Sequence, residues 1–198
     1  MVGEELETRI RRIVEQTFGE SGAGKIGSQA SRMPDERLPR PGKQGRLKVA
    51  LGSDHRGYVL KGQLNGYLEE LGHLVVDCGI KDGEVGDYPD IALRVCEKVV
   101  RKTCDVGILI DAVGIGSAIA ANKIKGIRAA VCHDVPSAKS SRLHNDANVL
   151  SLGSGIVNRG LARSIVKTWL ETPFEGGRHI GRIEKIAKME KEGLDAGL

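Results

Sequence analysis

Residues 105–123 read DVGILIDAVGIGSAIAANK, and this stretch decides the class of fold. The apolar run at 105–110 has the length of a buried strand. It ends at Asp111, and a glycine turn at 114–116 then leads into an alanine-rich segment at 117–123 that has helical composition. A buried strand that passes through a tight turn into a helix is typical of α/β proteins with a parallel sheet.

The same alternation of short apolar runs and amphipathic segments continues on both sides of this stretch, from residue 46 onward. It predicts an α/β fold with a five-stranded parallel sheet and helices on both faces. In such sheets, ligands bind beyond the carboxyl ends of the strands. The expected strands are 47–52, 73–77, 105–110, 127–132 and 148–152, and the expected helices are about 56–71, 89–101, 117–123, 136–143, 156–170 and 178–191.

Composition narrows the function classes. The chain has 198 residues, a formal net charge of +4 and 3% aromatic residues, which argues against an aromatic platform for single-stranded nucleic acid. No apolar stretch is long enough for a transmembrane helix, and the first residues do not form a secretory signal. The four cysteines show no metal-ligand spacing and are expected to be reduced and buried. We therefore expect a soluble cytoplasmic protein that binds neither nucleic acid nor membrane.

The first 45 residues differ in composition from the rest. Residues 4–18 place apolar side chains at helical spacing, which predicts an amphipathic helix within a segment 1–18. Residues 19–45 are rich in glycine and proline, as in a flexible linker, and 46–198 form the expected main domain. The helix either packs on its own domain or within an oligomer, or it docks on another protein. It resembles the encapsulation peptides that direct enzymes into bacterial microcompartments.

Polar side chains gather where the expected strands end. Asp111 closes an otherwise apolar strand and could be a general base, a metal ligand or a helix cap. The glycines at 114–116 allow backbone N–H groups to approach an anion. Asp54-His55 and His144 supply acid–base groups that work at neutral pH. Arg178 and Arg182, four residues apart, share a helix face that is either solvated or binds a phosphate.

Together these segments resemble the ribose-5-phosphate isomerase type B family, which also includes the galactose-6-phosphate isomerase subunits. The resemblance covers residues 47–191 in order and spacing. It implies a Rossmann-like sheet, a metal-free and cofactor-free aldose–ketose isomerisation of a phosphorylated sugar, and dimers whose active sites draw residues from both subunits. The matching segments are GSDHRGYVLK (52–61), DYPDIA (87–92), GIGSAIAANKIKGIRAAVC (114–132), SRLHNDANVLSLGSG (141–155) and EGGRHIGRIEKI (175–186).

The resemblance also assigns roles to single residues. Asp54 and His144 would open the sugar ring, and the backbone amides of residues 114–116 would hold the enediolate oxygen. Arg178 and Arg182 of the partner subunit would bind the phosphate. The substrate-binding residues implied in this way are His55, Tyr88, Gly114, Ile115, Gly116, Ser117, Asn145, Arg178, His179 and Arg182.

The chain departs from the family pattern at three positions. Asp111 stands where many members have the cysteine that abstracts the C2 proton, and Ser117 stands where another branch has a glutamate base. Gly155 replaces an arginine that contacts phosphate. We therefore expect Asp111 to be the base, with burial raising its pKa toward a useful range.

The most direct reading is an isomerase that converts ribose 5-phosphate to ribulose 5-phosphate in the pentose phosphate pathway, as a homodimer or a dimer of dimers. One alternative is a non-catalytic or altered-substrate homologue that serves as a microcompartment component, with residues 4–18 bound to a shell protein. Another is a Mg²⁺ or phospho-acceptor site built from Asp54 and Asp111.

Overall fold

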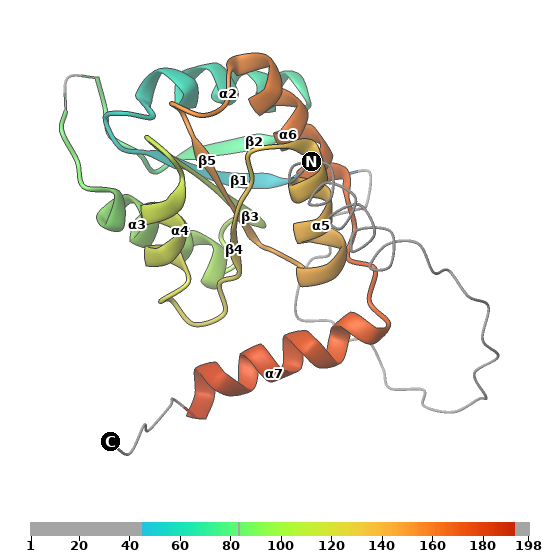
Figure 1. Cartoon of the computed structure of the whole chain (residues 1–198). Helices are drawn as coiled ribbons and strands as arrows, with labels where there is room; N and C mark the ends of the chain where they lie inside the picture. The colour runs from blue at the N-terminus through green and yellow to red at the C-terminus, as the bar shows by residue number, and fades with distance from the viewer. Residues whose placement is uncertain (1–44, 83, 193–198) are drawn as a thin grey trace, which may run out of the picture. The chain divides into compact units, whose positions relative to one another are not determined.

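The computed structural model describes residues 45–82 and 84–192 (Figure 1). The predicted N-terminal helix at 4–18, and all of the predicted linker except its last residue, lie outside the described residues. Five strands form one sheet in the order β2-β1-β3-β5-β4, and every neighbouring pair is parallel. The strands are β1 (Lys48–Ser53), β2 (Leu74–Asp77), β3 (Val106–Asp111), β4 (Ala129–Val131) and β5 (Val149–Gly153).

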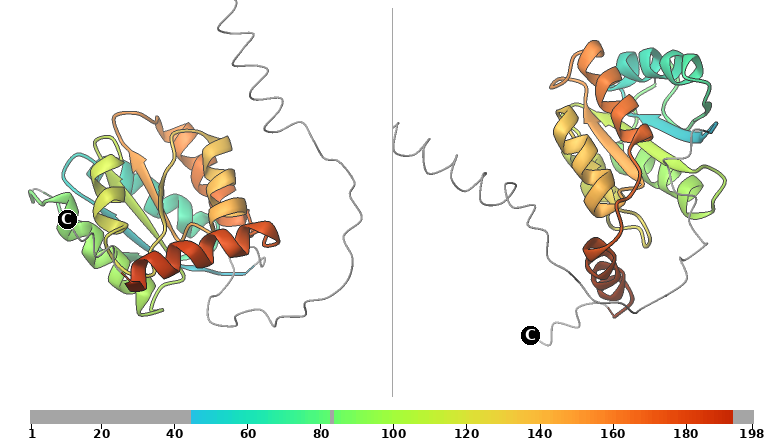
Figure 2. Two further views of the ribbon diagram at one scale, coloured as in Figure 1. Left: turned by 60° about the horizontal axis from the view of Figure 1, so that its bottom comes forward. Right: turned by 90° about the vertical axis from the view of Figure 1, so that its right-hand side faces the viewer.

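The helices cover both faces of this sheet, which confirms the predicted α/β class. Apolar side chains of α2, α5 and α6 pack on one face, and those of α3 and α4 pack on the other. Helix α7 lies across one end of the sheet and on neither face (Figure 2). The helices are α2 (Tyr58–Glu70), α3 (Tyr88–Val100), α4 (Ile115–Ala121), α5 (Val135–Asn145), α6 (Arg159–Glu171) and α7 (Arg178–Glu192).

Because all strands run in one direction, the sheet has two distinct ends. We call the end where the strands finish the carboxyl edge, and the end where they start the amino edge. β1 and β3 are neighbours, with Ser53 paired to Ile110, so the residues that follow them lie side by side at the carboxyl edge. Helix α5 begins just after β4 at the carboxyl edge and ends just before β5 at the amino edge. This reversal decides where the candidate site residues fall.

The element boundaries differ slightly from the predicted ones. Helix α4 begins at Ile115, two residues earlier than predicted, because Gly114 adopts a left-handed φ of 82° and caps the helix directly. Strand β4 is limited to 129–131 and lies at the sheet edge. Within 45–82 and 84–192, no helix combines the length and apolar character needed to cross a membrane.

Candidate active site

The side chain of Asp111 is fully hydrogen-bonded by its own loop. The carboxylate oxygen Oδ1 accepts hydrogen bonds from the backbone N–H groups of Val113, at 2.8 Å, and Gly114. Oδ2 accepts from the backbone N–H of Ser117 at 3.0 Å and from its hydroxyl at 2.6 Å. The residue is 4% exposed. The carboxylate therefore ties the end of β3 to the start of α4, as expected of a helix cap.

This arrangement changes the expected ionisation of Asp111. Burial by itself raises the pKa of the carboxyl group, but the hydrogen bonds from Ser117, Gly114 and Val113 stabilise the charged form and together lower the pKa below its ordinary value. The expectation of a raised pKa is therefore wrong. Asp111 is ionised at neutral pH.

The glycine turn leaves two N–H groups open. The N–H of Gly114 donates to Asp111, so it does not face a ligand as predicted. The N–H groups of Ile115 and Gly116 have no acceptor among the described residues. A Cβ atom on Gly116 would lie 2.8 Å from the ring of Tyr88, so the absence of a side chain at 116 lets this tyrosine lie against the turn. These groups together form one wall at the carboxyl edge.

Asp54 is another carboxylate at this edge, and only one of its two oxygens accepts hydrogen bonds from described residues. Its Oδ1 accepts hydrogen bonds from the backbone N–H groups of Arg56 at 2.9 Å and Gly57 at 3.0 Å. No described group donates to its Oδ2, although the residue is 6% exposed. His55 follows it with an exposed side chain. Asp54 therefore keeps one carboxylate oxygen for a ligand, whereas Asp111 keeps none.

His133 is a residue of this edge to which the sequence analysis assigned no role. It follows β4, and its Nε2 lies 3.0 Å from the carbonyl oxygen of Val113. Because a carbonyl only accepts, Nε2 must carry the proton, which leaves a lone pair on Nδ1 in the neutral ring. The residue follows an apolar strand, and this position at a strand end was the only sequence signal that could have indicated it.

The remaining predicted residues gather at the amino edge. The rings of His144, near the end of α5, and His179, in the first turn of α7, stack with their centroids 4.5 Å apart. The Nε2 atom of each lies 3.6 Å from the same carboxylate oxygen of Glu175. Burial, followed by the positive charges of His144, Arg178 and Arg182, lowers the pKa of His179 despite the opposing charge of Glu175.

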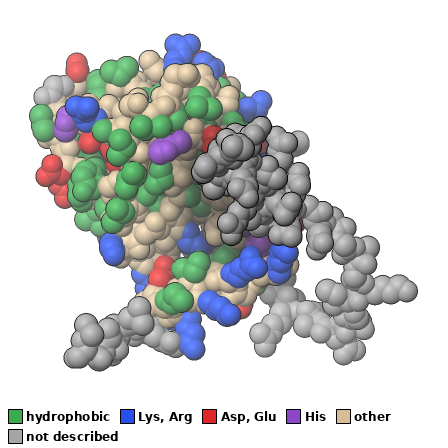
Figure 3. Space-filling model, in the orientation of Figure 1, with side chains coloured by type: hydrophobic (Ala, Val, Ile, Leu, Met, Phe, Trp, Pro, Cys, Tyr) green, Lys and Arg blue, Asp and Glu red, His purple; other side chains and the backbone are tan. Residues whose placement is uncertain are grey.

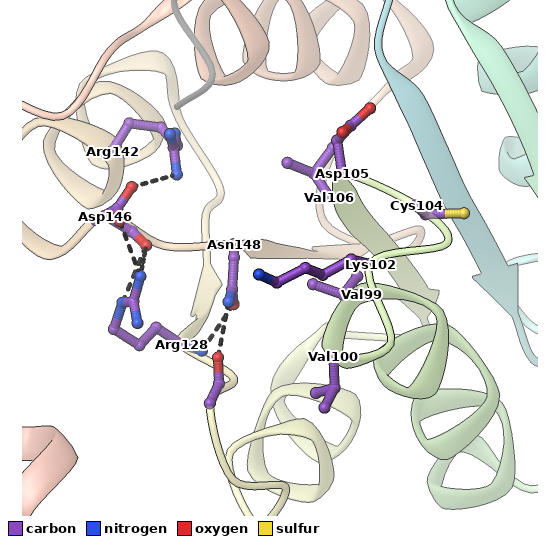
Figure 4. A pocket seen from close by; sticks show the side chains of 11 residues that line it. Val99, Val100, Lys102, Cys104, Asp105, Val106, Arg128, Arg142, Asp146 and Asn148 are labelled. Carbon is purple, nitrogen blue, oxygen red and sulfur yellow. Dashed lines mark hydrogen bonds and ion pairs between the residues drawn. The ribbon is translucent and has the colours of Figure 1, made fainter. Parts of the chain in front are cut away.

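A network of ion pairs fixes this end of α5 (Figure 4). Asp146 adopts a left-handed φ of 44° directly after His144 and Asn145. Its carboxylate pairs with Arg128 at 2.9 Å and with the buried Arg142 at 3.1 Å. Arg128 also donates to the backbone carbonyl of Asn145 at 3.0 Å. The network holds the turn that presents His144 and Asn145.

Arg178 and Arg182 are exposed on α7, and neither takes part in an ion pair within the described part of the chain. Lysine and arginine side chains gather along the surface in this region (Figure 3). These two cations remain available to an anionic ligand.

The structure therefore divides the predicted site between two edges. The carboxyl edge carries Asp54, His55, Tyr88, Asp111 and the turn at 114–117. The amino edge carries His144, Asn145, Arg178, His179 and Arg182. At about 3.3 Å per residue, the six residues of β3 separate the edges by about 20 Å. His144 thus cannot reach a ligand at Asp54 of the same chain, although the sequence analysis paired them.

The acidic and histidine side chains at the two edges differ in whether they could bind a metal ion. The suggested Mg²⁺ site at Asp54 and Asp111 is not supported, because three of their four carboxylate oxygens already accept backbone or hydroxyl donors. The group of potential ligands within the described residues is instead His144, Glu175 and His179, whose ligand atoms lie within 4.8 Å of one another. Such a set suits Zn²⁺ better than Mg²⁺.

Comparison with known proteins identifies the family. The model of the Ribose/Galactose Isomerase family matches residues 49–186. Ribose-5-phosphate isomerase B of Escherichia coli is 46% identical over 144 residues, which is 73% of this chain and 97% of that protein. D-erythrulose-4-phosphate isomerase of Pectobacterium atrosepticum is 38% identical over 147 residues, 74% of this chain and 97% of that protein.

Solved structures agree with the sequence relatives. Ribose-5-phosphate isomerase B of Clostridium thermocellum superposes with a TM-score of 0.72 at 49% identity, covering 73% of this chain and 98% of that one. The matched region contains both edges described above. The chain therefore belongs to the Ribose/Galactose Isomerase family of sugar-phosphate isomerases.

Proposed function

We propose that this isomerase interconverts ribose 5-phosphate and ribulose 5-phosphate through an enediolate. The observation that carries the proposal is the carboxyl edge, where a buried ionised carboxylate lies beside a turn with two open N–H groups. An enediolate intermediate needs a base for the proton on C2 and donors for the developing oxyanion. The named activity of the Escherichia coli relative supports this choice of substrate.

A complete site requires a second copy of the chain. The two edges of one chain lie about 20 Å apart, so the groups at the amino edge can serve only a site on another molecule. In a two-fold symmetric dimer, the amino edge of each chain would meet the carboxyl edge of its partner and form two equivalent sites. We therefore propose a homodimer, alone or as part of a dimer of dimers, with shared active sites.

Ring opening needs one group that takes a proton from the anomeric hydroxyl and one that gives a proton to the ring oxygen. Asp54 offers its free Oδ2 for the first task. His144 of the second copy would supply the other proton, and His55, Tyr88 and Asn145 would contact the sugar hydroxyls. The open sugar then presents its C2 proton to the carboxyl edge.

Asp111 is proposed as the base at C2. An ionised carboxylate can do this work at neutral pH without a raised pKa, but each of its lone pairs accepts a hydrogen bond from the loop. The hydroxyl of Ser117 is the donor to Oδ2 that can rotate away, since the other donor to this oxygen is the backbone N–H of Ser117, which is fixed in α4. This rotation would free Oδ2 to accept the C2 proton. The carboxylic acid would then return this proton to C1 while the hydroxyl proton on O2 passes to O1, so that C2 becomes the carbonyl carbon and C1 carries the hydroxyl group.

The N–H groups of Ile115 and Gly116 would hold the enediolate oxygen during this transfer. Arg178 and Arg182 of the second copy, with His179, would bind the phosphate group. Because its pKa is lowered, His179 would act as a neutral hydrogen-bond partner and not as a third cation. No metal or cofactor takes part in this scheme, so we expect EDTA to leave the rate unchanged.

The first test uses the full-length chain and measures two rates. One is the conversion of ribose 5-phosphate to ribulose 5-phosphate, and the other is the isomerisation of erythrulose 4-phosphate. The second substrate is included because a 38% identical relative is named for it. Turnover of ribose 5-phosphate with the higher kcat/KM supports the proposal. Inactivity of a folded dimer on both substrates would favour the alternative, a homologue that binds sugar phosphates without converting them.

The N-terminal segment carries a separate proposal. Residues 4–18 would dock on a shell protein and place the enzyme inside a bacterial microcompartment of the cytoplasm, as their resemblance to encapsulation peptides suggests. Fusion of residues 1–45 to a fluorescent protein should then direct it into compartments. Deletion of these residues should leave a folded and active enzyme. Loss of folding in the deleted chain would show a structural role instead.

A further inference from the structure

A cavity of about 480 Å³ opens beside the carboxyl edge, and the proposed reaction scheme does not use it. The segment between β1 and α2, the loop after β5 and the start of α6 form its walls. Ala112, the residue after Asp111, also lines it. The cavity is therefore next to the loop that carries the proposed base.

The charge of this cavity is positive and uncompensated. Arg56 and Arg159 line it, and none of its lining residues is acidic. Neither arginine takes part in an ion pair among residues 45–82 and 84–192. The cavity at the amino edge (Figure 4) is lined by residues of both charges, because Asp105 and Asp146 lie there beside basic residues. Two guanidinium groups without a carboxylate favour an anionic ligand.

The loop after β5 leaves room for the cavity and connects its wall to the loop of Asp111. The hydroxyl of Ser154 lies 3.0 Å from the carbonyl oxygens of both Arg56 and Asp111, so it joins the two loops. Gly155 has no side chain to fill the cavity, and a Cβ atom there would lie 3.1 Å from the carbonyl oxygen of Ala112. An anion held here would be fixed relative to Asp111.

We propose that Arg56 and Arg159 bind the phosphate group of the substrate in this cavity. The inference rests on the proposed isomerase function, and it makes the two arginines determinants of specificity for phosphorylated sugars. Guanidinium groups suit this ligand because each can donate two parallel hydrogen bonds to phosphate oxygens. Arg178 and Arg182 of the second copy would approach the same phosphate from the opposite side.

The test compares the full-length wild type with Arg56→Ala, Arg159→Ala and the double variant. Arg94→Ala is the matched control, since Arg94 is exposed on α3, lines none of the cavities described above and makes no ion pair within the described residues. Each arginine removed from the cavity should raise the KM for ribose 5-phosphate about tenfold, with kcat changed far less. The inhibition constant of inorganic phosphate should rise in parallel. Values equal to those of the control would overturn the proposal.

Two further outcomes separate this inference from the proposed function. If phosphate inhibition weakens in the double variant while the KM stays at the wild-type value, the cavity binds free phosphate and the proposal is wrong. If the wild type isomerises no sugar phosphate, binding of inorganic phosphate is measured by titration calorimetry instead. Binding that is lost in the double variant and kept in Arg94→Ala would still support an anion site in the cavity, and unchanged binding would refute it.

Discussion

The two edges of the sheet hold their functional side chains in different ways. At the carboxyl edge, Asp54 and Asp111 accept hydrogen bonds from backbone N–H groups no more than six residues away. At the amino edge, side chains hold one another over longer sequence separations, as in the contacts of Glu175 with His144 and of Arg128 with Asp146. Local backbone turns thus fix Asp54 and Asp111 at the carboxyl edge. The groups proposed to meet a second chain are held instead by contacts between side chains of distant segments.

The largest effect on activity is expected when a chain substituted at one edge is combined in one dimer with a chain substituted at the other edge. Asp111→Asn and His144→Asn should each lower the rate by about 10² to 10⁴, because each removes a proton-transfer group. A heterodimer of these two variants contains one site with both lesions and one site with none. Purified with two different tags, it should regain about half of the wild-type activity.

The matched control for this experiment combines two lesions of the same edge. A heterodimer of Asp111→Asn and Asp54→Asn has a damaged carboxyl edge in both sites, so it should stay inactive. If both heterodimers stay inactive, sites are complete within one chain and the division of the site between two copies is wrong.

A smaller effect tests the role of Asp111 at the carboxyl edge. Ser117→Ala removes the side-chain hydrogen bond that contributes most to lowering the pKa of Asp111. The pKa should therefore rise, and the acid limb of the pH–rate profile should move to higher pH while the enzyme remains active. His133→Ala serves as the comparison, because His133 is bonded to this loop through Nε2 and keeps a lone pair on Nδ1 in the neutral ring. A far larger loss of rate in His133→Ala than in Asp111→Asn would make His133 the base.

At the amino edge, the pH dependence of stability should report on His179. Its pKa is lowered in the folded chain, so the unfolded chain binds a proton more readily as the pH falls through about 6.5. The free energy of unfolding should thus be lower at pH 5.5 than at pH 7.5, with protein concentration held constant. Urea titrations should show a smaller difference for His179→Asn. An unchanged difference would mean that other groups cause the pH dependence.

The smallest expected effect is that of thiol modification. All four cysteines are buried, and burial raises the pKa of each thiol, in Cys96 to about 12. Treatment of the folded enzyme with iodoacetamide at pH 7.5 should therefore change the rate by less than about twofold. Rapid inactivation traced to Cys132 would show that a thiol, and not Asp111, works at the carboxyl edge.

The sequence predicted the fold well because its apolar runs and turns are local signals. The five strands and the six helices of the described region follow from them, with shifts of one to three residues at most ends. The same reasoning placed Asp54 and Asp111 at neighbouring strand ends. It could also have separated His144 from them, since a helix that follows a parallel strand must run back to the amino edge.

Other properties of the site could not be predicted from the pattern of residues. The lowered pKa of Asp111 depends on where the hydroxyl of Ser117 and three N–H groups point, and the order of residues does not specify these directions. The shared contact of Glu175 with two histidines likewise depends on how the segment between α6 and α7 passes the end of α5. His133 was overlooked because its position after β4 does not by itself distinguish a solvent-facing side chain from one bonded to the Asp111 loop.

The distance between the two edges has a consequence for how such enzymes diverge after gene duplication. Two copies of the gene could each lose the residues of a different edge, and their products would still make one intact site when they associate. Each copy would then depend on the other, and neither would work alone. A chain whose site residues are divided between two edges can therefore evolve into an enzyme of two different subunits, each encoded by its own gene.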